Sequence, residues 1–376
     1  MLQATYGHYA GKYSEAQFSA NTTVGNPDLV QLVYVGPAGE GFEFAPGFDL
    51  ASNYLAVDGR FNAANVSFAK GLSSPVSREF TASVGRKLGG GGTAKAAYVR
   101  RKFTGIVEDF IDLTTGSASV ERDGVVYGPF VNSVYRNTED ATREYHALVF
   151  QGNYRVTPRW SLNGHWTVQL QNDGNFEGEA ANQPAISSDI GDYPEIFVAE
   201  RHFPTGRLAS FQRHKVRLWT IYSMGLGRFG TADAALLYRY GSPLHYSLVT
   251  AGDDEITDIQ RQLGVGYASL PANQTVYFGE RGSQSFDSAH LFDLAVNYAI
   301  PVFRSLRPWL KAEVVNLFND QTLIAWNIDV VQDPNSPTDR LGLHTGYTRG
   351  PSFGQADAND AYPLPRTFRV SLGFRF

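Results

Sequence analysis

The sequence predicts an all-β fold, an antiparallel transmembrane β-barrel, from three observations. Several long segments alternate apolar with polar residues, which is the period of a strand with one apolar face. No run of about 18 apolar residues is present, and helical periodicity beyond about two turns is absent. The connections between the alternating segments are short at one end and long at the other, as in outer-membrane barrels.

Ten strands are predicted in chain order. The alternation is clearest in RTFRVSLGFRF (366–376) and in WSLNGHWTVQLQ (160–171), where apolar residues occupy every second position over most of the segment. The predicted strands lie near residues 2–10, 77–88, 94–110, 132–156, 159–172, 211–224, 230–248, 284–301, 307–318 and 366–376. Short connections fall near 89–93, 157–158, 225–229 and 302–306, and long outer loops at 11–76, 111–131, 173–210, 249–283 and 319–365.

A soluble β-sandwich or up-and-down barrel would also alternate, and three features weigh against it. Several predicted strands are longer than the usual five or six residues. The polar face carries many charged and amide side chains, as the wall of a water-filled lumen would. Aromatic residues gather near strand ends, with Trp160 and Trp309 beside short turns and Tyr238 and Tyr240 towards the long loops.

Composition excludes several classes of function. The 376 residues contain no cysteine, so the chain has no disulfide scaffold, thiolate zinc site or cysteine nucleophile. The net charge is −5 and charged residues make up 18% of the chain, so no nucleic-acid partner is predicted. Aromatic residues amount to 13%, which excludes a disordered chain.

Motifs along nearly the whole chain carry a family resemblance. They are PRTFRVSLGFRF with its final Phe376, RPWLKAEVVNLFND (307–320), GYTRGPSFG (346–354), and the loop sequences GNFEGEAANQP (174–184), GDYPEIF (191–197), RHFPTGRL (201–208) and FGERG (278–282). Together and in this order they resemble the C-terminal part of a TonB-dependent outer-membrane receptor. The resemblance is to the large-loop, Oar-like subgroup, whose members often carry a carboxypeptidase-regulatory-like domain.

The resemblance implies a barrel of 22 strands filled by an N-terminal plug, of which this chain holds about ten C-terminal strands and no plug. It implies a location in the bacterial outer membrane and a non-enzymatic role. The chain would form the barrel portion of an energy-coupled transporter for a siderophore, glycan or peptide, and as a fragment it would not be competent alone. The implied partners are outer-membrane lipid, the missing N-terminal barrel and plug, TonB–ExbB–ExbD acting through the plug, and the barrel-assembly machinery, for which Phe376 would be the signal.

The predicted ligand contacts lie in the outer loops, since aromatic rings and arginine suit sugars, peptides and chelates. They are Tyr193, Phe203, Phe278, Arg281, Tyr347 and Arg349. The competing interpretation is that these side chains pack one loop against another. No cofactor is predicted: the carboxylates of Asp253–Asp258 could supply part of a Ca²⁺ site, but their spacing lacks the calcium-loop pattern and favours a solvated acidic loop.

A complete ten-stranded outer-membrane barrel is the rival hypothesis, either an omptin-like protease or a porin or adhesin. A protease of this kind needs acidic residues and an Asp–His pair at the outer rim, where His202 and His344 would be the candidates. The loop motifs do not support it. The first twenty residues also lack the pattern of a signal peptide, which counts against an intact exported barrel.

Overall fold

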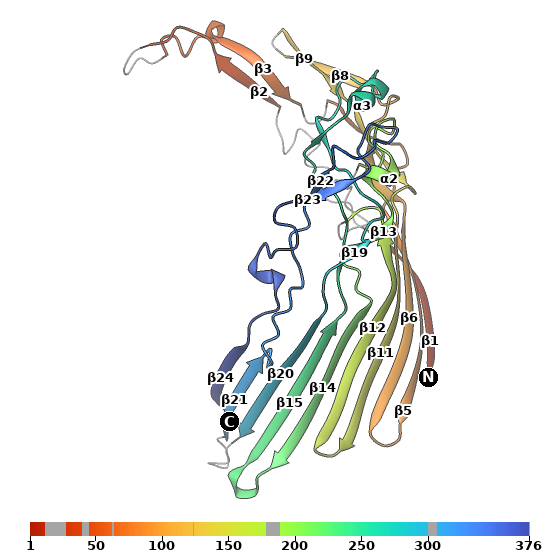
Figure 1. Ribbon diagram of the computed structural model, residues 1–376, viewed down its shortest axis with the longest axis vertical. Coiled ribbons are helices and arrows are strands. Elements are labelled where there is room, and N and C mark those ends of the chain that lie inside the picture. The colour runs from red at the N-terminus through yellow and green to blue at the C-terminus, as the bar shows by residue number, and fades with distance from the viewer. Residues whose placement is uncertain are drawn as a thin grey trace.

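One large antiparallel sheet dominates the computed structural model, which describes residues 1–11, 28–39, 45–61, 64–122, 124–177, 189–299 and 307–375 (Figure 1). Ten long strands, here called the wall, lie side by side in chain order, and each pairs antiparallel with the next. They are β1 (Leu2–Ala10), β5 (Val76–Leu88), β6 (Gly92–Thr104), β11 (Arg143–Thr157), β12 (Trp160–Gly174), β14 (His214–Gly225), β15 (Thr231–Gly241), β20 (Ala289–Ala299), β21 (Arg307–Val315) and β24 (Thr367–Arg375). Among the described residues the sheet ends at β1 and β24, which do not pair with each other.

The connections lie at two different ends of the wall. Tight hairpins join β5 to β6, β11 to β12 and β14 to β15, the last through a 3₁₀ turn, η2 (Gly227–Phe229), and all lie at the lower edge in Figure 1. The predicted short connection 302–306 lies outside the described residues. The long connections gather at the opposite edge (Figure 1). This asymmetry is the one expected of an outer-membrane barrel.

The wall has one apolar and one polar face, because directly opposite residues in antiparallel strands share a face. Phe150 lies opposite Ala96 on one side and Trp166 on the other, and Trp166 lies opposite Val216. The neighbouring residue on each of these strands points to the opposite face. There a polar row runs across β6, β11, β12, β14 and β15, made of Lys95, Gln151, His165, Arg217 and Arg239. The apolar face is therefore the lipid-facing one, and the polar face is the lumenal one.

The long connections fold into a second layer of structure, here called the cap, made of the described residues within 11–75, 105–142, 175–213, 242–288 and 316–366. Its elements are short. They are β2 (Leu29–Tyr34), η1 (Ala51–Asn53), β3 (Tyr54–Arg60), β4 (Val66–Phe68), β7 (Ile106–Phe110), β8 (Ser117–Arg122), β9 (Val125–Val131), β10 (Ser133–Thr138), α2 (Ala199–His202), β13 (Gly206–Arg207), β16 (His245–Tyr246), β17 (Asp254–Glu255), α3 (Asp258–Leu263), β18 (Asn273–Gln274), β19 (Gln284–Ser285), β22 (Val330–Gln332), β23 (Tyr347–Arg349) and η3 (Asn359–Ala361).

Several predicted strands are longer than the observed ones, because the alternation continues from the wall into the cap. The predicted strand 94–110 divides into β6 and β7 at Gly105, whose φ of 62° turns the chain out of the wall. The predicted strand 132–156 divides into β10 and β11, and β10 pairs with β4 and β7 in a separate three-stranded sheet. The predicted loop 111–131 is in turn part of a longer connection that contains the β8–β9 hairpin.

The other strand ends shift for local reasons. The wall strand predicted at 230–248 ends at Gly241, shortly before Pro243, which has no N–H for a ladder. The strand predicted at 307–318 ends at Val315, because Asn316 adopts a φ of 53°. The predicted strands 211–224 and 284–301 begin before β14 and β20, and the predicted loop 11–76 contains the β2–β3 hairpin and β4.

Buried side chains lie almost entirely in the cap. Three small apolar clusters form there, around Ile106 with Phe176 and Ile190, around Ile196 with Ile256, and around Val276 with Leu341 and Leu343. In the part of the chain that the structure describes, neither helix has the length or the apolar character needed to cross a bilayer. The cap is thus a packed layer that holds the outer ends of the wall strands.

Candidate ligand site

Arg281 is buried inside the cap and joins three of its segments. Its side chain is only 5% exposed. Nε donates to the carbonyl oxygen of Pro204 (3.1 Å), Nη2 to that of Asn175 (2.9 Å), and Nη1 lies 3.3 Å from Oε1 of Glu177. The guanidinium also stacks 4.9 Å from the ring centre of Tyr277. These contacts make Arg281 a structural tie of the cap, and its contact with a ligand stays a prediction.

Tyr193 and Phe203, two other predicted contacts, are half-buried between cap segments. The Tyr193 ring lies 4.9 Å from that of Tyr267, and its backbone N–H donates to the carbonyl oxygen of Ile111 (2.7 Å). Phe203 packs on the cluster around Ile106. For these two side chains the geometry favours loop-on-loop packing.

The remaining three predicted contacts come together around β23. The rings of Phe278 and Tyr347 lie 5.3 Å apart, and Tyr347 and Arg349 share one face of the strand. Tyr347 and Arg349 are both exposed, and the guanidinium of Arg349 lies 4.6 Å from the ring centre of Phe353. Phe278, Tyr347, Arg349 and Phe353 are here called the β23 surface.

The base of the β23 surface is fixed by a half-buried ion pair. Arg201 Nη1 lies 2.6 Å from Asp339 Oδ2, and Nη2 donates to the carbonyl oxygen of His344 (2.7 Å). The same guanidinium lies 5.7 Å from the ring centre of Phe278. Arg349, in contrast, forms no ion pair with the described residues. The surface therefore offers aromatic faces and one unpaired cation, which suit a sugar, a peptide or an anionic chelate.

A second candidate lies on the lumenal face of the wall, where the sequence analysis identified no site. A cavity of about 500 Å³ is lined there by side chains that include His165, Arg217, Trp219, Asp293 and Glu313. Arg239 Nη2 lies 2.9 Å from Asp293 Oδ2, whereas Arg217 forms no ion pair with described residues. The alternation places these residues on the polar face, but strand pairing is needed to bring them together.

Histidines proposed for a rim protease have structural partners. His202 is 2% exposed; its Nδ1 accepts from the Val198 N–H (2.9 Å), and its Nε2 lies 2.9 Å from Gln274 Oε1. Burial lowers the pKa of His202, so the ring is neutral. Nδ1 of His344 lies 2.9 Å from the carbonyl oxygen of Ser336.

The acidic run Asp253–Asp258 is spread over β17, the following residues and the start of α3. Asp254 accepts from Gln332 Nε2 (3.0 Å), and the carboxylates of Glu255 and Asp258 lie 3.7 and 3.8 Å from Arg261. Across the described ranges of the chain, no group of three or more histidine, aspartate or glutamate side chains is placed to hold a metal ion.

Three other carboxyls cluster where the segment 189–193 packs on β7. Burial raises the pKa of Asp192 to about 8, with further contributions from the charges of Asp109 and Asp189. Burial also raises the pKa of Asp189 to about 6 and that of Asp109 above its usual range. The Oδ1 atom of Asp192 is buried without a hydrogen-bond partner among the described residues. Near neutral pH the Asp192 carboxyl is therefore mainly protonated.

Comparison with solved structures identifies the fold. The outer membrane transporter YddB from Escherichia coli superposes with a TM-score of 0.51 at 13% identity, over 100% of this chain and 38% of that one. The ferric enterobactin receptor PfeA from Pseudomonas aeruginosa (TM-score 0.44, 13% identity, 100% and 38% covered) and the copper transporter OprC (0.42, 12%, 100% and 37%) are more distant. No protein-family model and no curated protein sequence matches the chain.

The chain spans a little over a third of the length of these transporters. The match to YddB covers the whole of the present chain, so the predicted all-β, antiparallel outer-membrane fold is confirmed. The count of 22 strands and the absent plug stay predictions. The chain has the fold of part of an antiparallel outer-membrane β-barrel.

Proposed function

We propose that this chain supplies the C-terminal wall and the outer cap of an energy-coupled outer-membrane transporter. In this proposal a plug and further strands complete the barrel, and TonB drives uptake through the plug. The cap captures a nutrient ligand, a siderophore, glycan or peptide, on the β23 surface. The ligand then passes the polar cavity of the wall on its way inward.

One observation carries the proposal: a lipid-facing apolar sheet, polar on its other face, is joined at one end to a packed cap with exposed aromatic and cationic side chains. A transporter needs all three parts. The likeness to YddB, an outer membrane transporter, over the whole of this chain supports the same assignment. Over the residues that the structure describes, the sheet ends at β1 and β24 without closing, which favours a partial barrel over a complete ten-stranded protease or porin.

Uptake measurements in the source cells test the proposal. Labelled ferric siderophores, oligosaccharides and oligopeptides are supplied with and without a protonophore. We expect one class to accumulate and its accumulation to fall when the protonophore is present. Accumulation that persists without the proton-motive force would be that of a passive pore and would contradict energy coupling.

The β23 surface is tested in the same assay. The pair Tyr347→Ala and Arg349→Ala removes one ring and the unpaired cation, so we expect the half-saturating ligand concentration to rise about tenfold or more. Thr348→Ala is the matched control, because Thr348 lies between them on the opposite face of β23 and is also exposed. Equal effects in both variants would exclude this surface as the capture site.

A further inference from the structure

Positive side chains gather on the apolar face of the wall at the cap end of β5 and β6. Arg78 and Lys102 lie directly opposite each other across the two strands, and both are exposed. Arg100 lies on the same face, two residues from Lys102. Like charges directly opposite in a sheet destabilise it, so this arrangement requires a compensating anion.

The described carboxylates supply only part of that compensation. Arg100 donates to Glu144 Oε1 from Nε (3.1 Å) and Nη2 (2.7 Å), and the same oxygen lies 2.9 Å from His146 Nε2. Arg78 and Lys102 form no ion pair within the described residues. Three cations and one carboxylate leave this group, here called the basic rim, with a formal charge of +2.

Asp173 is the next carboxylate in the row of Lys102. It lies beyond Glu144, on β12, and faces Arg207 of β13 across the strand pair. Adjacent strands are about 4.8 Å apart, so two strand spacings separate Asp173 from Lys102. Asp173 therefore leaves the charge of the basic rim on β5 and β6 uncompensated.

Aromatic residues place the basic rim at the membrane surface. Phe80 lies opposite both Tyr6 and Arg100, and Tyr98 lies one row further into the wall, opposite Ala82. Phe80 and Tyr6 are 39% and 67% exposed on the lipid-facing side. Aromatic side chains mark the boundary between the hydrocarbon and the lipid headgroups. The rim cations consequently lie at headgroup level, in the leaflet on the cap side.

A trough of small residues runs down the wall from the basic rim. Its upper part, of about 550 Å³, is lined by residues that include Ala4, Ala82 and Ala96. It shares Val84 and Ala96 with a lower groove of about 590 Å³. The two grooves therefore form one trough, whose upper end at Ala82 and Tyr98 lies one row below Phe80 and Arg100.

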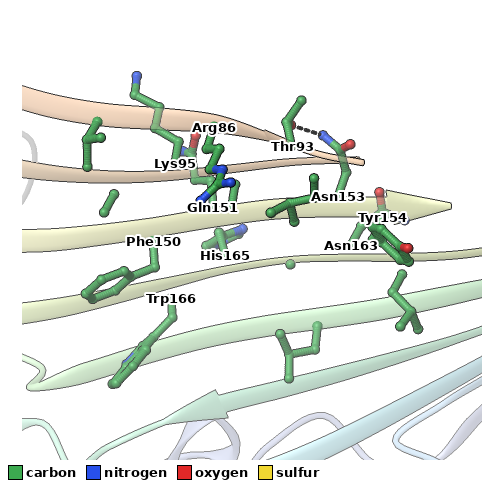
Figure 2. Close-up of a pocket in the computed structure, with 18 residues that line it drawn as sticks. Arg86, Thr93, Lys95, Phe150, Gln151, Asn153, Tyr154, Asn163, His165 and Trp166 are labelled. Atoms are coloured by element: carbon green, nitrogen blue, oxygen red, sulfur yellow. Dashed lines mark hydrogen bonds between the residues drawn. The ribbon is translucent and has the colours of Figure 1, made fainter. Parts of the chain in front are cut away.

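Two glycines, Gly152 and Gly164, line the lower groove. Gly152 lies opposite both Ala94 and Gly164. The stacked rings of Phe150 and Trp166, 5.2 Å apart, close one end, and Tyr154 lies at the other (Figure 2). An apolar trough between aromatic side chains matches the shape of an extended hydrocarbon chain.

We propose that the basic rim and the trough together bind a phosphorylated lipid of the cap-side leaflet. The phosphate is held by Arg78, Arg100 and Lys102, and an acyl chain lies along Ala82, Ala96 and Gly152. The occupant is a lipid because the cations and the apolar trough lie in neighbouring rows on the same membrane-facing side. The proposal depends on the membrane fold and is independent of which nutrient is transported.

Lipid binding to the full chain, extracted from membranes in neutral detergent, tests the proposal. The probe is a fluorescent phosphatidic acid, compared with phosphatidylcholine of the same acyl chains and with inorganic phosphate. We expect phosphatidic acid to bind more tightly than phosphatidylcholine, and inorganic phosphate not to displace it at equal concentration. Displacement by phosphate as effective as by lipid would indicate a free-phosphate site and overturn the assignment to a lipid.

A pair of double variants tests the rim. Arg78→Gln with Lys102→Gln should weaken phosphatidic acid binding about 30-fold. Lys87→Gln with Lys215→Gln removes the same charge from the lumenal face of the wall, and binding should change less than about twofold. Equal losses in the two double variants, or no loss in either, would overturn the proposal.

A pair of glycine variants tests the trough and keeps the rim intact. Gly152→Leu fills the groove, and a Cβ there meets only the Thr93 carbonyl oxygen at 3.7 Å. We expect about fourfold weaker binding for each methylene that is excluded. Gly85→Leu is matched, with only the Ala94 carbonyl oxygen at 3.7 Å and a position on the lumenal face, and it should bind normally. If Gly152→Leu bound phosphatidic acid as tightly as the parent, the acyl-chain site would be excluded.

Discussion

The wall and the cap are built by different physics from one chain. In the wall, large apolar side chains such as Phe368, Val370 and Leu372 are 67–74% exposed on the protein surface. Lipid, and not other side chains, surrounds them in an outer-membrane barrel. In the cap, Ile106, Ile196 and Leu343 are fully buried, and Arg281 and Gln260 are buried with them. Strand ladders hold the wall together, whereas the cap depends on side chains that join distant segments.

This difference determines which substitutions each region tolerates. Within the hydrocarbon layer, a wall position tolerates a polar side chain if it faces the lumen and resists one if it faces lipid. A cap position depends on its specific partners, since removal of one partner leaves the others buried and unpaired. Matched variants in the two regions can therefore separate the two modes of stabilisation.

The largest effect is expected from Arg281→Ala. The change leaves the carbonyl oxygens of Pro204 and Asn175 without their charged donor inside the cap, at a cost of about 4 kcal/mol of cap stability. Hydrogen exchange of cap amides should speed up by orders of magnitude while wall amides stay protected. Arg340→Ala, at an exposed cap residue, is the control. Simultaneous loss of wall protection would show that the two regions unfold as one unit.

Adjacent leucines in β15 test the wall. Leu236→Arg puts a charge on the lipid-facing side and should cost about 3 kcal/mol of folding free energy in bilayers. Leu237→Arg puts the same charge on the lumenal face, opposite Asp293, and should cost less than about 1 kcal/mol. Urea titration of tryptophan fluorescence in vesicles measures both. If the two variants were equally unstable, the assignment of the faces would be wrong.

Sequence reasoning could predict the wall because its rule is local. The alternation from Phe368 to Phe374 is that of β24. The rule failed at Gly105 and Asn316, where the chain leaves the sheet although the apolar–polar alternation continues. Only the positive φ values of these two residues end the wall strands there. The cap follows no such rule. Arg281 was selected as a ligand contact by residue type, yet its partners Pro204 and Asn175 lie 77 and 106 residues away.

Asp192→Asn should change how the stability of the cap depends on pH. The pKa of Asp192 in the fold is about 8, above the ordinary 3.8, so the folded cap favours the protonated carboxyl. Its stabilisation is complete below pH 4 and is lost as the pH rises through 8. At pH 9 the variant should protect the Ile111 and Tyr193 amides better than the parent, by about 2 kcal/mol. Asp253→Asn, at an exposed carboxylate, should leave the pH dependence of cap stability as in the parent. If Asp192→Asn also left it as in the parent, Asp192 would not be the group that titrates with a raised pKa.

Thr257→Ala is the mildest test, because it removes one hydroxyl with its two hydrogen bonds and no buried charge. Thr257 Oγ1 accepts from the Gln260 N–H (3.1 Å), Gln260 Oε1 accepts from the Thr257 N–H (2.9 Å), and the hydroxyl donates to the Leu341 carbonyl oxygen. The hydroxyl thus begins α3 and ties it to the cluster around Leu341, so its loss should cost about 1 kcal/mol. Exchange should accelerate about fivefold at the Gln260 and Arg261 amides and remain unchanged in the wall. Thr257→Ser keeps the oxygen and should exchange like the parent. If serine behaved like alanine, the methyl group of Thr257 would be the stabilising part, and packing rather than capping would hold α3 in the cap.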